Sequence, residues 1–309
     1  MATACGEPSA PSPDEGSCFT AYLPACDPPN SGENTHLKPQ ESDETPNTTT
    51  KEKRKKILVV EDDKDMQQYI LSILGNTFRT TACDNGEEAL DEAGKENYDL
   101  IITDLMMPRM DGMELARHLR ADLSTSHIPI IMLTAKDDEA SQLEGFKTGI
   151  DLYIVKPFSS GVLKAQIRAL TTNRERRASA FNNNPAASAA TLCDNETDRL
   201  FMEKLDHCIE QQLSDSSLSV DSLAAELSIG RSLFYQKVKA ISGLTPNDYL
   251  RTYRLKKAAQ LIRNGDMRIN EVCYQVGFSS PSYFTKRFTA QFGVSPSEYA
   301  RQASTSSPV

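Results

Sequence analysis

The sequence reads ILVVEDD from Ile57 to Asp63. Four apolar residues in a row, most of them β-branched, are typical of a strand that is buried on both faces, as in a parallel sheet. Three carboxylates follow at once, so we expect them at the carboxyl end of that strand, where open α/β sheets bind their ligands. This stretch therefore predicts both a class of fold and the position of a site.

Short apolar runs recur further along the chain, and each ends at a polar residue. The runs 100–103, 130–133 and 152–155 are followed by Asp104, Thr134 and Lys156. We expect strands near 57–60, 79–82, 99–103, 129–133 and 152–155, and helices near 64–75, 86–94, 112–121, 137–148 and 159–171. This alternation predicts an α/β domain with a doubly wound, parallel, five-stranded sheet.

The polar groups at the strand ends each have an alternative explanation when they are taken alone. Carboxylates and hydroxyls can cap helices or form turns, and a lysine can be a surface charge. Together they suit a different role, because carboxylate oxygens are ligands for Mg2+ while a hydroxyl and an ammonium can donate to phosphate oxygens. Lys156 precedes Pro157, and an X-Pro bond can be cis and direct the preceding side chain into a site.

Composition predicts two domains and an uneven distribution of charge. The chain has 309 residues, 39% of them apolar and 25% charged, which is enough for two separate cores. The net charge is −9, but residues 228–302 hold twelve Lys or Arg against four Asp or Glu, a net charge of +8. The basic C-terminal region therefore favours a nucleic-acid partner although the whole chain is acidic.

The cysteine pattern and the lengths of the apolar runs indicate the cellular compartment of the chain. The seven cysteines form no CxxC pair, which supports neither a zinc site nor a disulfide framework. No apolar run is long enough to cross a bilayer, and no signal peptide is present. We therefore expect a cytoplasmic chain with no membrane segment.

The chain divides into five segments by composition. Residues 1–54 are polar and lack periodicity, which predicts a mostly disordered segment. Within it, residues 16–24 alternate like a strand and resemble the last strand of a histidine-kinase ATP-binding domain; chance alternation in a disordered tail is the alternative. The α/β domain is expected at 55–172, a linker at 173–195, a helical domain at 196–302 and a disordered tail at 303–309.

The C-terminal region contains two copies of the same pattern, a helix followed by a turn and a second helix. The first has helices at 219–227 and 231–240, the second at 269–277 and 281–291, and a long helix at 246–264 joins them. Gly277 suits a left-handed helix end, and Pro281 suits the first turn of the next helix. A small bundle with solvated charges is the alternative, but two copies and the local charge favour two helix-turn-helix units that bind DNA.

Residues 56–172 resemble a response-regulator receiver domain. The resemblance rests on VVEDD at 59–63, DLMMPRMDG at 104–112, Thr134-Ala135 and KPF at 156–158. The intervals of thirty residues from Asp104 to Thr134 and twenty-two from Thr134 to Lys156 agree with the family spacing. The resemblance implies a phosphoryl donor, a histidine kinase, and a phosphorylation-dependent change in the last two helices and strands, a face that commonly forms a homodimer.

The resemblance also implies a role for each group of the site. Asp104 would be the phosphoacceptor, and Thr134 and Lys156 would contact the phosphoryl oxygens. The set of Mg2+ ligands would comprise the carboxylates of Glu61, Asp62 and Asp104 and the backbone carbonyl of Met106.

Three further positions concern switching and hydrolysis. Tyr153 would be the switch aromatic that turns inward on phosphorylation, with an ordinary half-buried strand aromatic as the alternative. Met106 and Lys136 occupy places that orient the hydrolytic water in this family. A thioether accepts hydrogen bonds weakly and an ammonium is no base, so we expect slow autodephosphorylation.

Residues 196–302 resemble an AraC-type DNA-binding domain, chiefly through GFSSPSYFTKRFTAQFGVSP at 277–296. The resemblance implies that both recognition helices enter successive major-groove faces. The expected base contacts are Arg231, Ser232, Tyr235, Gln236, Ser282, Thr285 and Lys286. The expected phosphate contacts are Arg287, Lys237, Lys239 and the cations of the joining helix, Arg251, Arg254, Lys256, Lys257 and Arg263.

These inferences together predict a two-component response regulator whose phosphorylation at Asp104 controls binding to double-stranded DNA. It would act as a homodimer when phosphorylated, with RNA polymerase as a further candidate partner, and would be a phosphoacceptor and not an enzyme. The alternative is the C-terminal output part of a hybrid sensor histidine kinase. A receiver that serves only as a phosphate sink would leave the basic helical half unexplained.

Overall fold

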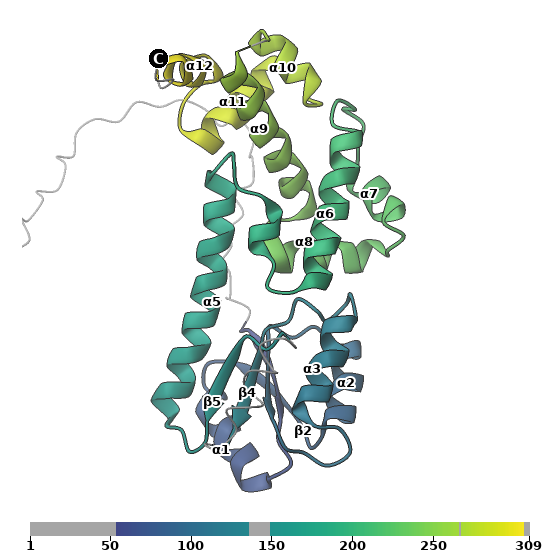
Figure 1. Cartoon of the computed structure of the whole chain (residues 1–309), viewed down its shortest axis with the longest axis vertical. Helices are drawn as coiled ribbons and strands as arrows, with labels where there is room; N and C mark the ends of the chain where they lie inside the picture. The colour runs from purple at the N-terminus through teal and green to yellow at the C-terminus, as the bar shows by residue number, and fades with distance from the viewer. Residues whose placement is uncertain (1–53, 136–148, 266, 306–309) are drawn as a thin grey trace, which may run out of the picture. The chain divides into compact units, whose positions relative to one another are not determined.

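The computed structural model describes residues 54–135, 149–265 and 267–305. Its strands are β1 (Lys56–Val60), β2 (Arg79–Cys83), β3 (Leu100–Asp104), β4 (Ile130–Thr134) and β5 (Leu152–Val155). They form one parallel sheet in the order β2-β1-β3-β4-β5 (Figure 1). The predicted doubly wound α/β fold is confirmed.

Helices cover both faces of this sheet, and strands β1, β3, β4 and β5 are accordingly mostly apolar, whereas the edge strand β2 is mostly polar. The helices are α1 (Lys64–Leu74), α2 (Gly86–Lys95), α3 (Gly112–Ala121) and α5 (Ser160–Asn183). Successive side chains of a strand point to opposite faces. Leu58 and Val60 therefore pack with residues of α2 and α3, whereas Ile57 and Val59 pack with residues of α1 and α5.

The order of the strands places a crevice at the carboxyl ends of β1 and β3. β1 lies between β2 and β3, so the direction in which the sheet grows reverses there. Such a switch point is the usual ligand site of an open parallel sheet. Asp104, the last residue of β3, is in register with Leu133, and Thr134 is in register with Val155. Polar ends of three neighbouring strands therefore reach one edge.

The C-terminal region is helical. Its helices are α6 (Glu196–Gln211), α7 (Val220–Glu226), α8 (Arg231–Ser242), α9 (Pro246–Asn264), α10 (Ile269–Gln275), α11 (Pro281–Phe292) and α12 (Pro296–Thr305), preceded by a 3-10 turn at Ala189–Leu192. The two predicted helix-turn-helix units are α7 with α8 and α10 with α11. α9 joins them by contributing Tyr249 and Leu250 to one apolar core and Ala258 and Ile262 to the other.

The last helix of the α/β domain is longer than expected. The prediction placed a linker at 173–195, but α5 continues to Asn183, where Phe181 is buried and stacks on Tyr249 with ring centroids 5.9 Å apart. The predicted disordered tail begins inside α12, which ends at Thr305. The predicted disorder before Arg54, the strand-like fragment 16–24, Lys136 and the helix expected at 137–148 lie outside the described residues.

Among the described residues, no helix is both long enough and apolar enough to cross a membrane.

Candidate functional site

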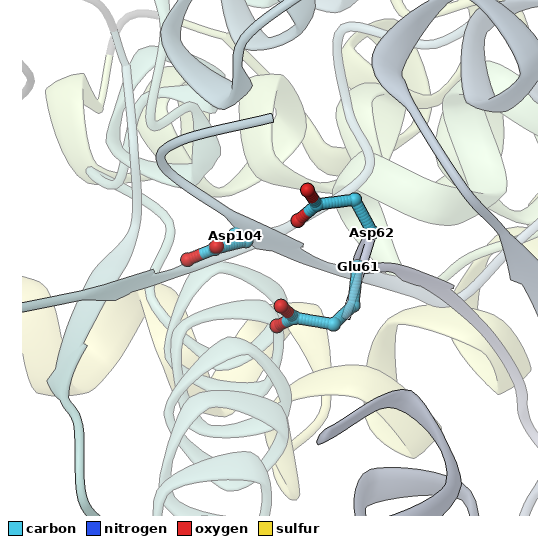
Figure 2. A group of neighbouring side chains, drawn as sticks. All are labelled: Glu61, Asp62 and Asp104. Atoms are coloured by element: carbon cyan, nitrogen blue, oxygen red, sulfur yellow. The ribbon is translucent and has the colours of Figure 1, made fainter. Parts of the chain in front are cut away.

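Three carboxylates gather at the switch point of the sheet. Glu61 and Asp62 directly follow β1, and Asp104 ends β3. One carboxylate oxygen from each lies within 4.8 Å of the other two, and Figure 2 shows Glu61 and Asp62 reaching toward the side where Asp104 lies. Glu61 is buried, Asp62 is exposed and Asp104 is intermediate, so the cluster opens to solvent on one side. A hard cation of small radius fits this set of oxygen donors.

The third carboxylate of the acidic run has a structural role. Asp63 is the N-cap of α1, and its Oδ1 accepts hydrogen bonds from the backbone N–H groups of Asp65 (2.9 Å) and Met66 (3.0 Å). These bonds satisfy donors that the first turn of a helix otherwise leaves unpaired. The cap turns Asp63 away from the cluster and fixes the start of α1 immediately after Asp62.

Lys156 connects the carboxylates across the sheet. Its Nζ lies 2.9 Å from Glu61 Oε2 and 2.9 Å from Asp104 Oδ1. The Lys156–Pro157 bond is cis, as the sequence allowed, and the side chain points into the site. The backbone N–H of Leu105 also donates to Asp104 Oδ1, at 2.9 Å. Two donors therefore hold the Oδ1 atom of Asp104.

The charges of the site shift two pKa values. Burial raises the pKa of Glu61, the hydrogen bond from Lys156 partly opposes this rise, and the neighbouring Asp104 charge adds to it. Burial alone would lower the pKa of Lys156, but its hydrogen bonds to Asp104 and Glu61 leave it above the ordinary value. Lys156 therefore stays an ammonium. A second cation nearby would favour the ionised form of Glu61.

The loop after β3 folds back closely over Asp104. The Gly112 N–H donates to the Leu105 carbonyl at 3.0 Å, and a Cβ at Gly112 would lie 2.2 Å from the Asp104 carbonyl oxygen. Only glycine allows this approach. Met106, whose backbone carbonyl was the predicted fourth metal ligand, begins this loop, and its side chain is 76% exposed.

Thr134 and Tyr153 lie on the strands beside Asp104. Thr134 is buried at the end of β4, and its hydroxyl donates to the Ala135 carbonyl at 3.2 Å. Tyr153 is half-buried on β5, and its hydroxyl donates to the Met113 sulfur at 3.9 Å. This position agrees with the alternative interpretation of Tyr153 as a packed strand aromatic, while its switching role stays a prediction.

The predicted base-contacting residues lie on α8 and α11. All are exposed except Gln236, which is half-buried. The opposite sides of the same helices are buried in the two apolar cores, through Phe234, Val238, Phe284 and Phe288. Each helix therefore presents a polar face to solvent while its other face packs the bundle, as a recognition helix requires.

Three of the predicted phosphate contacts are wrong, because the cations are buried. Lys237 is fully buried and forms an ion pair with Asp198 of α6. Arg254 donates to the backbone carbonyls of Gly277 (3.2 Å) and Asp215 (2.5 Å). Lys256 donates to the Ala187 carbonyl at 3.0 Å and lies 3.3 Å from the centre of the Phe181 ring. Buried cations need acceptors inside the protein, and these three cations are held by such contacts and not presented to a DNA backbone.

Two polar groups went unnoticed in the sequence. Gln67 lies in the buried stripe of α1 that continues through Ile70 and Leu74, and a polar residue in an apolar helical stripe is the signal that could have found it. Tyr283 is exposed on α11 beside Arg287, whose guanidinium carbon is 5.0 Å from the ring centre, and a hydrogen bond from Arg287 lowers the pKa of Tyr283. A tyrosine between the predicted base contacts Ser282 and Thr285 is a further candidate for the DNA surface.

Comparison with protein families agrees with this architecture. Residues 57–168 match the response regulator receiver domain, and residues 223–302 match a helix-turn-helix domain. The chain joins a receiver domain to a helix-turn-helix domain. Both domain resemblances stated from the sequence are therefore confirmed.

Known proteins resemble this chain over different lengths. It is 33% identical to Histidine kinase P4 from Formosa agariphila, over 82% of this chain and 19% of that protein. It is 42% identical to the transcriptional regulatory protein ResD from Bacillus subtilis, over 42% of this chain and 52% of ResD. The chain thus spans about a fifth and about half of the length of these two relatives.

Solved receiver domains are also similar. One is the receiver domain of a sensor histidine kinase from Pseudomonas aeruginosa, whose structure has a magnesium ion coordinated in the active-site cleft. It is 30% identical, with a TM-score of 0.36, over 38% of this chain and 96% of that one.

Proposed function

We propose that Asp104 accepts a phosphoryl group from a histidine kinase and that this modification controls DNA binding by the helical domain. One observation carries the proposal: three carboxylates and the Lys156 ammonium meet at the switch point of the sheet. In this role the chain is a phosphoacceptor that regulates transcription, and the kinase activity resides in its donor.

The geometry supports separate tasks for the two oxygens of Asp104. Lys156 and the Leu105 N–H hold Oδ1, so Oδ2 is the oxygen that attacks the phosphorus of a phosphohistidine. The new O–P bond forms as the N–P bond breaks; the bonding electrons go to the histidine nitrogen, and the donor imidazole takes a proton from solvent. The Lys156 ammonium and the Thr134 hydroxyl donate to the transferred oxygens, which is the positioning and charge stabilisation that phosphoryl transfer needs.

The donor set fits Mg2+, and this chain supplies the ligands. Glu61, Asp62 and Asp104 provide three carboxylates, and the Met106 carbonyl is the proposed fourth ligand. Glu61, with its raised pKa, gains most from a nearby cation. When bound, Mg2+ would neutralise the carboxylates and the incoming phosphoryl oxygens.

The DNA-binding surface is proposed to be the exposed faces of α8 and α11. Arg231 and Gln236 on α8 and Lys286 on α11 have the donors that read guanine and adenine edges in the major groove. Dimerisation on phosphorylation, through the face that contains β5, and contact with RNA polymerase stay predictions. Light scattering with and without a phosphoryl donor tests the dimer.

The function is tested by selecting DNA from a randomised duplex pool with the full chain. Binding is compared with and without acetyl phosphate and Mg2+, and with Asp104→Ala as the control. We expect selection of a repeated site that sharpens only when Asp104 is present and phosphorylated. Equal binding by all samples would contradict phosphoryl control and leave DNA binding in place, whereas no selection at all would contradict the DNA-binding role.

A second candidate function is the output part of a hybrid sensor histidine kinase. The observation that favours it is the similarity to Histidine kinase P4, which extends over 82% of this chain and therefore across both domains. Reading the genomic sequence upstream of the codon for Met1 tests it. A kinase-coding frame continuous with this one would support the hybrid, and a stop codon or a promoter there would contradict it.

A further inference from the structure

Gln67 is a polar residue in a buried position beside the acidic cluster. It lies on the inner face of α1, is 4% exposed, and shares that face with Ile70 and Leu74. Its neighbour Gln68 is exposed. A buried amide costs stability unless it finds hydrogen-bond partners, so its contacts indicate what it does.

The side-chain nitrogen of Gln67 is surrounded by three oxygens. Nε2 lies 3.0 Å from the Glu61 carbonyl, 3.1 Å from the Cys83 carbonyl and 3.0 Å from Asp84 Oδ1. All three are acceptors, so the NH2 group and not the amide oxygen must face them. The Glu61 N–H also donates to the Cys83 carbonyl, at 3.2 Å. Gln67 therefore ties together the ends of β1 and β2.

These contacts act on the peptide that orients the metal ligands. The Glu61 carbonyl belongs to the peptide bond between Glu61 and Asp62, so holding it fixes the direction in which both side chains leave the backbone. Asp63, one residue later, is fixed as the cap of α1. The Glu61-Asp62 segment is thus held on one side by the cap and on the other by Gln67. Ligands held in place before the cation arrives lose less entropy on binding.

We propose that Gln67 is a positioning residue for the cation site and sets its affinity through the backbone of Glu61. This inference rests on the proposed function of the acidic cluster as a Mg2+ site. Partners that orient metal ligands typically contribute about 10-fold to 100-fold in affinity. Because Gln67 acts through the backbone, we expect an effect near the lower end of that range.

The test measures Mg2+ binding to the full chain by isothermal titration calorimetry. Gln67→Leu and Gln67→Glu both remove the N–H donors, the first with an apolar side chain and the second with nearly the same shape. Gln67→His keeps one N–H at a similar reach. Gln68→Leu is the matched control, because it removes the same group from an exposed position on the same helix. The unfolding temperature of each variant is measured in EDTA.

We expect Gln67→Leu and Gln67→Glu to raise the Mg2+ Kd about 10-fold, Gln67→His to raise it by less, and Gln68→Leu to leave it unchanged. A lower unfolding temperature with an unchanged Kd would overturn the proposal, because Gln67 would then support only the fold. Equal losses in all three Gln67 variants would also overturn it, because N–H donation would not be the cause. If the unsubstituted chain binds no Mg2+, the proposed cation site itself fails.

Discussion

The charges of the four side chains in the site would favour a divalent cation there. Glu61, Asp62 and Asp104 carry one negative charge each when ionised, and Lys156 returns one positive charge. The remaining charge of −2 would repel the anionic phosphoryl group that approaches Asp104. A divalent cation cancels that excess, whereas a second lysine would leave half of it. The choice of residues therefore matches metal-dependent phosphoryl transfer.

We expect Met106 to influence how long a phosphoryl group on Asp104 persists. Its side chain is 76% exposed next to Asp104 and cannot hold a water molecule firmly for attack on phosphorus. We expect Met106→Asn to shorten the phosphoryl lifetime about fivefold, because one good hydrogen bond contributes about 1 kcal/mol, whereas a factor of ten in rate would need about 1.4 kcal/mol. The lifetime is followed on phosphate-affinity gels. Met106→Leu is the matched control, and equal lifetimes for the Asn and Leu variants would contradict the explanation.

The roles of individual charges could be predicted only in part. The strand-end carboxylates and Lys156 were identified because each directly follows an apolar run. Lys237 and Lys286 look alike in sequence, since both lie on helices in a basic region. The first is fully buried against Asp198 and the second is exposed, and this difference arises from packing between helices that are distant in sequence.

At the scale of elements, local sequence predicted most positions well. The described strands and the two helix-turn-helix units lie within a few residues of the expected ranges, because strand period, caps and turn residues act locally. The end of α5 was missed because a charged run at Arg174 was interpreted as a linker. Arg and Glu are good helix formers, and the helix continues until Asn184, just before Pro185, with Phe181 buried near its end.

The turn between α10 and α11 depends on Gly277. Its φ is +79°, and an added Cβ would lie 2.4 Å from the Leu213 carbonyl. Gly265 has the same φ of +79° but has no heavy atom within 4 Å of an added Cβ, so it is a matched control. We expect Gly265→Ala to cost about 1–2 kcal/mol of stability and Gly277→Ala about 1–3 kcal/mol more. Urea unfolding measures both, and equal losses would contradict the steric explanation.

Asp206 on α6 should make the helical domain less stable as pH rises. Burial raises its pKa to about 6, and the hydrogen bond from Tyr249, at 2.6 Å, partly opposes this rise. Between about pH 4 and 6 the folded protein therefore binds a proton that the unfolded chain has released, so stability falls as pH rises through this window. The cost above pH 6 is about 2–3 kcal/mol, because one pKa unit corresponds to about 1.4 kcal/mol.

We expect Asp206→Asn to remove this fall while keeping an acceptor for Tyr249. The variant should match the unsubstituted chain near pH 4 and be more stable at pH 7, as measured by urea unfolding across the pH range. Glu203→Gln, on the exposed side of the same helix, is the control for loss of a carboxylate. A variant that is less stable than the unsubstituted chain at pH 7 would contradict the sign of the prediction.

At the scale of the whole molecule, the net charge of the basic helical segment is opposite in sign to that of the rest of the chain. The chain has a net charge of −9, while residues 228–302 have +8. An acidic remainder repels DNA, so contact with a duplex is favoured only through the basic helical domain. The burial of Lys237, Arg254 and Lys256 reduces the number of cations on that surface, so the net charge of the segment overstates the number of phosphate contacts.

The separate role of the basic helical domain can be tested through the salt dependence of DNA affinity. On a random-sequence duplex, Lys286 of α11 acts only through its charge, so Lys286→Ala should reduce the slope of log affinity against log salt by about 0.9. Lys204→Ala removes the same charge from an exposed position on α6 and should leave the slope unchanged. Fluorescence anisotropy of a labelled duplex at several salt concentrations gives both slopes. Equal slopes for the two variants would mean that α11 does not approach the phosphates, and the proposed recognition surface would then have to lie elsewhere.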